Sequence, residues 1–315
     1  MRIKNVSNII MRNYALTFKT LAYKACVFVV FATALGLMLK LRLRGLVDAF
    51  LPLAQDCLSL VRSLFSNGTA GDIPQILNRH AHEFVEFVSG NVGSIVVTAV
   101  ILIIGIFVYR YISGVSDCVS IIVLDGYAST LSKKPYFGVL FENLGRIAAF
   151  QGVEVLFACV YSLAVAALEY GVSILLLKFV PMLVPFACVA VTVLSHGLYN
   201  TMMSRFATEC LIGKKKIGQA MKDGFHPEKG YFAKMFMSYS VISLINYYLF
   251  VTTFVFTFGV GTVLLIPLYA NVIAGMRVID RYVIDKRKYF IDYDNIVVPK
   301  ELRENDEQLL KDVEI

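Results

Sequence analysis

Residues 235–276 read MFMSYSVISLINYYLFVTTFVFTFGVGTVLLIPLYANVIAGM, and this run contains no Lys, Arg, Asp or Glu. A helix needs about 20 apolar residues to cross the hydrocarbon core of a bilayer, where every backbone N–H and C=O must be paired within the helix. The run has 42 residues, which is enough for two such helices. Thr257–Thr262, near its middle, contains two glycines and favours a turn, so the run predicts a transmembrane helical hairpin.

The rest of the chain has the same apolar character. It is 57% hydrophobic and 17% charged, whereas an average soluble domain has about 25% charged residues. We therefore expect an all-α fold, a polytopic membrane bundle of six transmembrane helices with additional interfacial amphipathic helices. The predicted spans are 21–39, 92–111, 147–168, 171–194, 233–254 and 256–276.

The first predicted span has two interpretations. Its basic front and apolar centre are also features of a signal peptide, which would have its cleavage site at Ala32–Ala34. However, the apolar run continues through Leu35–Leu39, where a mature N-terminus should turn polar. We therefore favour a spanning helix in which Lys24 extends its long stem toward the membrane interface.

The distribution of Lys and Arg predicts the orientation. Placing the N-terminus in the cytoplasm puts 24 of the 30 basic residues on the cytoplasmic side, as the positive-inside rule requires. Both termini are then cytoplasmic, in what we expect to be a bacterial cytoplasmic membrane. The same bias accounts for the net charge of +7 without a nucleic-acid partner. The expected organisation is an N-terminal segment 1–20, a membrane domain 21–281 that includes an outer amphipathic segment 40–91, and a soluble cytoplasmic tail 282–315.

The signatures of membrane enzymes do not fit this sequence. The CDP-alcohol phosphotransferases place four carboxylates around two divalent cations, but here Ile122 and Arg146 stand at two of those four positions, leaving Asp125 and Glu142. One Asp and one Glu cannot hold two cations and a diphosphate. The six cysteines form no CxxC pair, and the predicted topology leaves only Cys57 outside, so no disulfide is expected there. We expect neither enzymatic activity nor a cofactor.

The outer segment contains a weak candidate for a metal site. Its second predicted amphipathic helix carries His82 and Glu86, which are i,i+4 neighbours, as well as His80 and Glu83. The two pairs point along different faces, and no outer cysteine cluster completes a site. We therefore interpret them as a solvated polar face, and the outer segment as a possible docking surface for a protein partner.

A second amphipathic pattern follows the fourth predicted span. Apolar residues from Phe206 to Met221 recur along one face, and we expect a helix that lies along the cytoplasmic leaflet. Lysines close to the membrane interact with anionic head groups at about 1 kcal/mol each. The predicted partners are anionic inner-leaflet lipids, and the residues facing them are Lys214, Lys215, Lys216 and Lys222.

Few polar side chains fall within the predicted spans. Gln151 and Glu154 lie near the cytoplasmic end of the third span, and Asn271 lies at a similar depth in the sixth, so we expect Glu154 to pack near Asn271. Lys178, Glu169 and Asn246 form a second possible group toward the outer face. Such residues usually face the bundle interior, where they either line a solute path or hold helices together by hydrogen bonds.

Residues 118–281 resemble the membrane domain attached to some glycerophosphodiester phosphodiesterases, and related uncharacterised bacterial six-helix membrane families. The resemblance rests on the order of a basic amphipathic segment, the aromatic-rich entry Tyr231–Phe236, a helical hairpin, and a proline-containing last helix that ends at Arg277. It implies a helical membrane domain. It does not imply phosphodiesterase activity, because the catalytic domain of those enzymes is not present in this sequence.

Two classes of function follow from these patterns. The first is a non-enzymatic scaffold or accessory protein that binds lipid or partner proteins, through the outer segment or the C-terminal tail. The alternative is a small-solute transporter or permease subunit that uses Glu154 and Asn271. A water-filled cavity that reaches Glu154 would favour the transporter, because a scaffold needs none.

Overall fold

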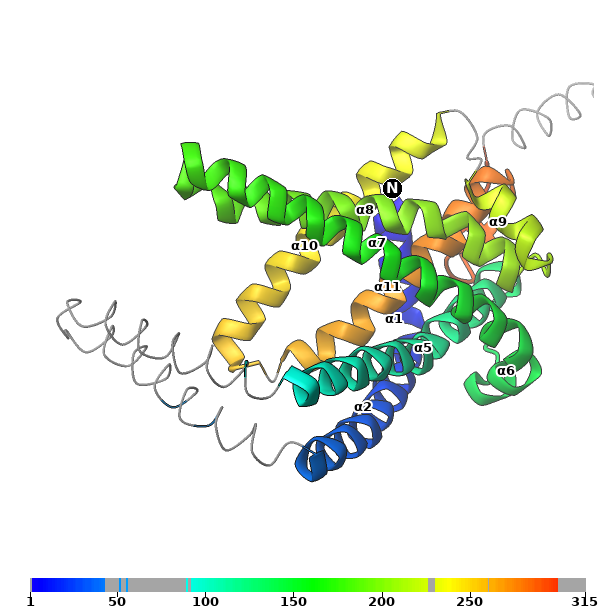
Figure 1. Cartoon of the computed structure of the whole chain (residues 1–315). Coiled ribbons are helices and arrows are strands. Elements are labelled where there is room, and N and C mark those ends of the chain that lie inside the picture. Colours follow the sequence, from blue (N-terminus) through cyan, green and yellow to red (C-terminus); the bar gives the residue numbers. More distant parts are fainter. Residues whose placement is uncertain are drawn as a thin grey trace, which may run out of the picture. The chain divides into compact units, whose positions relative to one another are not determined.

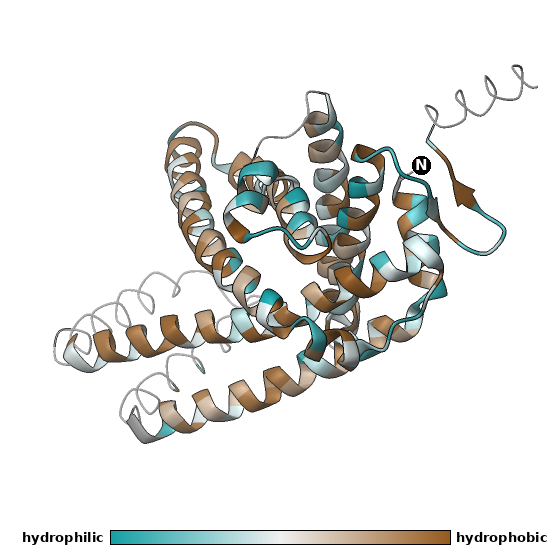
Figure 2. Ribbon diagram, turned by 90° about the vertical axis from the view of Figure 1, so that its right-hand side faces the viewer, coloured by the Kyte–Doolittle hydropathy of each residue, from teal (hydrophilic) through white to brown (hydrophobic). Residues whose placement is uncertain are grey.

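The structure, a computed structural model, describes residues 2–42, 92–225, 230–259 and 261–299, together with positions 51, 55 and 89. The described residues contain six helices that are long and apolar enough to cross a membrane, so the predicted all-α membrane fold is confirmed (Figure 1). These helices are α2 (Tyr14–Arg42), α5 (Val92–Thr130), α7 (Leu144–Phe179), α8 (Val184–Leu211), α10 (Tyr231–Thr257) and α11 (Thr262–Ile284). Figure 2 shows hydrophobic residues along most of their length.

Shorter elements connect or flank the six long helices. They are α1 (Arg2–Arg12), α6 (Tyr136–Glu142), the 3-10 turn η2 (Pro181–Leu183), α9 (Ile217–Phe225) and the antiparallel strands β1 (Tyr289–Phe290) and β2 (Ile296–Val297). The outer segment between α2 and α5, including His82 and Glu86, lies outside the described residues, apart from the three isolated positions. The end of the tail after residue 299 also lies outside them.

The chain divides into two compact units. The smaller unit is Cys26–Arg110. In it the rings of Phe28 and Phe31 contact Tyr109, the Phe31 ring at a centroid distance of 5.3 Å. The larger unit combines Met1–Ala25 with Tyr111–Ile315. The larger unit contains the polar side chains of the functional site.

The core of the larger unit lies around α11 and the second half of α5. Ala274, Met276 and Ile279 on α11 are fully buried, as are Val119 and Ala128 on α5. The amphipathic helix α1 packs against α11 through an apolar face that includes Val6, Ile9 and Ile10. Val263, Leu264 and Ile266 in the first half of α11 are exposed, so the uncharged stretch 262–276 fits a spanning helix that faces lipid on one side and protein on the other.

Helix α5 is much longer than predicted. We expected the span to end at Tyr111, but the helix continues to Thr130 and its added residues are mostly buried. Asp117 is tolerated within it because Lys24 of α2 forms an ion pair with it at 2.8 Å. Lys24 therefore pairs with a carboxylate instead of extending freely to the interface. The helix ends where Leu131 adopts a positive φ of 57°, a left-handed conformation typical of helix C-termini.

The boundary between the third and fourth spans was also wrong. We placed it near 169–170, whereas α7 continues to Phe179 and the chain turns at Val180, with φ −146° and ψ 80°. The cause is Pro181, because a residue that precedes proline is disfavoured in the helical conformation, while proline itself fits the first turn of the next helix. Lys178 consequently lies in the last turn of α7, and not in the fourth span as expected.

The inner amphipathic segment is two elements and not one helix along the leaflet. Phe206 and Cys210 belong to the last turns of α8 and are buried there, and α9 begins at Ile217. Helix α9 packs closely on α8, because a Cβ atom on Gly224 would stand 2.7 Å from Cβ of Phe206. The apolar stripe is thus covered in large part by protein, which the spacing of apolar residues alone does not distinguish from lipid.

The first part of the C-terminal tail is packed against the larger unit. Tyr289 is buried and accepts a hydrogen bond from Nδ2 of Asn5 at 2.8 Å, and Tyr127 donates to the carbonyl of Ile291 at 3.3 Å. Arg12 and Asp292 add an ion pair at 3.5 Å. Strands β1 and β2 pair here, and residues 289–292 belong to the folded unit and are not a free tail.

Candidate functional site

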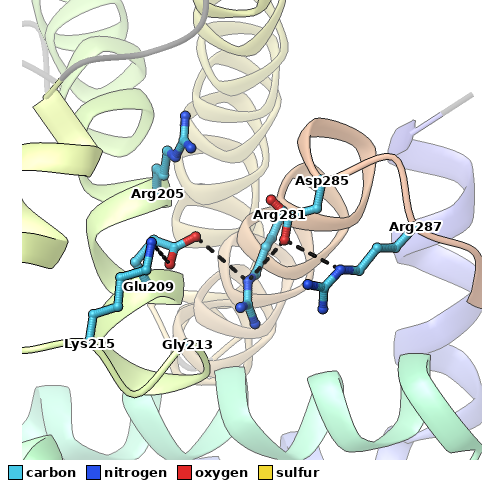
Figure 3. Close-up of a pocket in the computed structure, with 7 residues that line it drawn as sticks. All are labelled: Arg205, Glu209, Gly213, Lys215, Arg281, Asp285 and Arg287. Atoms are coloured by element: carbon cyan, nitrogen blue, oxygen red, sulfur yellow. Dashed lines mark ion pairs between the residues drawn. The ribbon is translucent and has the colours of Figure 1, made fainter.

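A polar pocket lies at the C-terminal ends of α8 and α11. Its volume is about 380 Å³, and ion pairs join many of the side chains around it (Figure 3). It is lined by Arg205, Glu209, Gly213, Lys215, Arg281, Asp285 and Arg287. We call it the α8–α11 pocket.

Local sequence positions these groups. Arg205 and Glu209 are one turn apart at the end of α8, and Arg281 and Asp285 have the same spacing at the end of α11. Between α8 and α9 the chain turns back over Glu209 at Gly213. A Cβ atom at Gly213 would stand 2.8 Å from both the carbonyl oxygen and Oε2 of Glu209, so no larger residue fits without a shift.

Glu209 is the central carboxylate of the pocket. Its side chain is 6% exposed and forms an ion pair with Lys215 at 2.8 Å. On the other side, Nε of Arg281 lies 4.0 Å from Oε1 of Glu209 and 3.7 Å from Oδ2 of Asp285. Asp285 also faces Arg287 at 3.8 Å. The lining thus contains four cationic side chains and two carboxylates, and Asp223, which is not part of the lining, also pairs with Lys215 at 2.8 Å.

Arg281 carries a donor without an acceptor. Its Nε is buried and has no hydrogen-bond partner among the described residues, since both carboxylates lie beyond hydrogen-bonding distance. Figure 3 shows its guanidinium between Glu209 and Arg287. A buried donor left unsatisfied costs about 1–3 kcal/mol. An anion in the pocket would supply the missing acceptor.

Lys215 is held in its charged form. Hydrogen bonds to Asp223 and Glu209 raise the pKa of Lys215 above its ordinary value, and the hydrogen bond from Lys215 lowers the pKa of Asp223. Both directions favour the charged forms, so the ion pairs of Lys215 persist across neutral pH.

A second pocket of about 190 Å³ adjoins the first. It shares Arg281, Asp285 and Arg287 with the α8–α11 pocket and adds Asp125, Ser129 and Tyr282. The Tyr282 hydroxyl donates to Oδ1 of Asp125 at 3.1 Å. Together the two pockets place a cationic region next to one rich in hydroxyl and carboxylate groups, and this combination suits a phosphate that carries a hydroxylated substituent.

The predicted intramembrane residues are only partly brought together. Glu154 accepts hydrogen bonds from Nε2 of Gln151, at 3.0 Å, and from the hydroxyl of Tyr199. Cys118 of α5 extends this cluster by donating to Oε1 of Gln151 at 3.4 Å. Asn271 instead donates to Oγ1 of Thr17 at 3.2 Å, and α11 packs mainly on α1, α8 and α10. Glu154 and Asn271, which we expected to lie together, therefore form their hydrogen bonds with different partners on different helices.

The second predicted group does not form. Lys178 lies over the ring of Phe179, 5.9 Å from its centroid, and Glu169 accepts a hydrogen bond from Thr192 at 2.6 Å. Among the described residues, no hydrogen bond or ion pair joins Lys178, Glu169 and Asn246. The extension of α7 to Phe179 explains this, since it separates Lys178 from Glu169 by more than two helical turns.

Most of the α8–α11 pocket was missed from the sequence. Of the four lysines we singled out, only Lys215 lines it, while Lys214 and Lys216 are exposed beside it and Lys222 is exposed on α9. The other lining residues could have been found from two Arg-x-x-x-acid spacings. These are Arg205 with Glu209 at the end of α8, and Arg281 with Asp285 at the end of α11. Both spacings are common in ordinary surface helices, so the signal is weak without knowledge that the two helix ends meet.

The fold and the pocket define a polytopic α-helical membrane protein with a basic site at the ends of two spanning helices. No protein-family model matches the chain, and no curated protein or solved structure matches it significantly. The resemblance of residues 118–281 to phosphodiesterase-associated membrane domains thus stays an expectation. Within the part of the chain that the structure describes, no group of three or more His, Cys, Asp or Glu side chains is arranged to hold a metal ion.

Proposed function

We propose that this protein is a non-enzymatic membrane accessory protein that binds the phosphate-bearing head group of an anionic lipid in the α8–α11 pocket. The observation that carries the proposal is the excess of cationic side chains around a pocket in which the buried Nε of Arg281 lacks an acceptor. Guanidinium groups bind phosphate oxygens through paired, charge-assisted hydrogen bonds.

The position of the pocket favours a lipid over a soluble ligand. Both helices that end at the pocket are membrane-span candidates. Their ends are where head groups lie in a bilayer of ordinary thickness. The distribution of Lys and Arg supports a cytoplasmic position for this end, where anionic lipids are concentrated. A volume of about 380 Å³ lies within the range of roughly 300–1,000 Å³ common for small-molecule sites.

The first test removes charge from the pocket without touching its buried centre. Replacing Arg205 and Arg287 with Gln should weaken retention of an anionic phospholipid about tenfold or more, since each charge-assisted hydrogen bond contributes about 1.5–3 kcal/mol. The full-length protein in lipid nanodiscs would be measured by native mass spectrometry, with a neutral phospholipid as reference. Arg287 is largely exposed, so its loss should leave the fold intact.

The matched control replaces Lys216 and Lys222, two exposed lysines outside the pocket, with Gln. It removes the same charge and should leave lipid retention near that of the unmodified protein. Equal losses in the two double variants would contradict a pocket and indicate general surface attraction. Displacement of the lipid by millimolar inorganic phosphate would indicate that the pocket takes a free phosphate and not a head group.

The transporter alternative rests on a different observation. Glu154 is an ionisable residue within the spanning helix α7, and it is hydrogen-bonded to Gln151 and Tyr199. Such clusters occur along proton and solute paths, but they also hold helices together. Neither of the two pockets described above is lined by Glu154, which is why we place the transporter second.

We expect Glu154→Gln to leave thermal stability and lipid retention nearly unchanged, because an amide accepts the hydrogen bond from Gln151 or Tyr199 as a carboxylate does. Unfolding in detergent and lipid retention in nanodiscs would be compared with the unmodified protein. If Glu154→Gln instead abolished a pH-driven solute flux in proteoliposomes while the protein stayed folded, the transporter would replace the accessory function.

A further inference from the structure

Helix α6 has two apolar faces, and the residues that the structure describes cover only one of them. Tyr136, Val139 and Leu140 are buried against the larger unit. On the other side, Phe137 is 59% exposed and Phe141 is 71% exposed. A short helix bathed in water would be expected to present polar residues there, so the exposed phenylalanines indicate an apolar neighbour.

The place of α6 in the chain identifies that neighbour as the membrane. The helix connects α5, which ends at Thr130, with α7, which begins at Leu144, and both of these are membrane-span candidates. Helix α7 exposes an apolar stripe of its own at Leu156, Val160 and Leu163. In a spanning helix such a stripe faces lipid. Because α7 begins two residues after α6 ends, its lipid-facing stripe ties α6 to this end of the span.

The charges beside α6 match a lipid surface. Lys133 and Lys134 are exposed immediately before the helix, and Arg146 follows it. The acidic residue Glu142 is at the last position of the helix. A helix with aromatic residues on one side and lysines next to it is typical of segments that lie in the interface plane, with the apolar face buried about 5–10 Å deep.

We infer that α6 is an interfacial anchor. Its outer face, formed by Phe137, Phe141 and the adjoining Leu144, inserts between the head groups and acyl chains of the leaflet at this end of the bundle. Lys133 and Lys134 contact the phosphates of anionic lipids. This inference does not depend on a ligand in the α8–α11 pocket.

The test uses the absence of tryptophan from the chain. In Phe137→Trp the new side chain is the only indole in the protein, and it replaces one exposed aromatic ring with another. The full-length variant would be reconstituted into vesicles that contain lipids brominated near the glycerol end of the acyl chain, because bromine quenches indole fluorescence on contact. We expect strong quenching and an emission maximum shifted to the blue. Phe141→Trp, at the other exposed phenylalanine, should behave in the same way.

Two control variants calibrate the measurement. Tyr293→Trp replaces a side chain that is 82% exposed in the loop between β1 and β2, and it should report water. Leu163→Trp replaces one that is 73% exposed within α7, and it should be quenched most by lipids brominated deep in the acyl chain. The Phe137→Trp emission should fall several-fold more than that of Tyr293→Trp in lipids brominated near the glycerol.

Either of two results would overturn the anchor. If both α6 variants emit like Tyr293→Trp while Leu163→Trp is quenched, the outer face of α6 is in water. If both are shifted to the blue but are not quenched by either brominated lipid, a protein surface covers that face and the membrane does not.

Discussion

Glu209→Ala should lower the free energy of unfolding by about 3 kcal/mol or more, the cost typical of removing one partner from a buried ion pair. The carboxylate is 6% exposed and lies between Lys215 and Arg281. Lys215 still pairs with Asp223, at 2.8 Å, in this variant, so Lys215 loses little of its stabilisation. Arg281 loses one of the two acidic neighbours of its buried guanidinium. Unfolding of the purified protein in detergent, followed by circular dichroism, would measure the change.

Asp223→Asn is the matched control for this prediction. Asp223 is the other carboxylate that contacts Lys215, but its side chain is 37% exposed, so the variant should be hard to distinguish from the unmodified protein. Similar losses in Glu209→Ala and Asp223→Asn would contradict the central position we give Glu209. The milder variant Glu209→Gln should retain an anionic lipid at least as strongly as the unmodified protein, since it removes a negative charge beside the proposed ligand.

The second large effect is expected at the crossing of α8 and α10. A Cβ atom on Gly197 would stand 3.0 Å from the backbone nitrogen of Ser240 and 3.1 Å from its Cα, with the Ser240 Oγ closer still. Because backbone atoms cannot rotate away, Gly197→Val would force the two helices apart. Overpacking of this kind costs about 1–3 kcal/mol and occasionally more. We expect the same detergent unfolding measurement to show a loss in this range or above it.

Gly171→Ala provides the control for the crossing. Gly171 also lies within a spanning helix, but nothing stands within 4 Å of a Cβ atom placed there. Replacing glycine with alanine inside a helix favours folding by about 0.5–1 kcal/mol. Gly197→Ala and Gly171→Ala should therefore change stability in opposite directions. A gain in stability at both positions would show that α8 and α10 do not approach as closely as Gly197 indicates.

Local sequence was sufficient for the elements that a membrane imposes. The uncharged run 235–276 predicted two helices with a turn between them, and the chain does turn at Phe258 and Gly259, both with positive φ. This worked because the hydrocarbon core excludes charge and demands internal backbone pairing, and both demands are visible residue by residue. Helix ends were less predictable. The expected span ended at Tyr111, whereas α5 continues to Thr130 and includes Asp117, which pairs with Lys24.

By itself, then, the sequence determined the all-α membrane fold, its six spans, and the polar residues available inside them. The tertiary structure alone decided which of these residues meet. Glu209 and Arg281 lie near the ends of α8 and α11, and only the packing of these two helices brings them to one pocket. Glu154 and Asn271, which the same depth had suggested as partners, bond within different helix pairs. The depth of a residue in the membrane follows from the hydropathy of its own helix, and it can be read from the sequence. Which residues contact one another depends on how several helices pack, as at the close approach of α8 and α10 at Gly197.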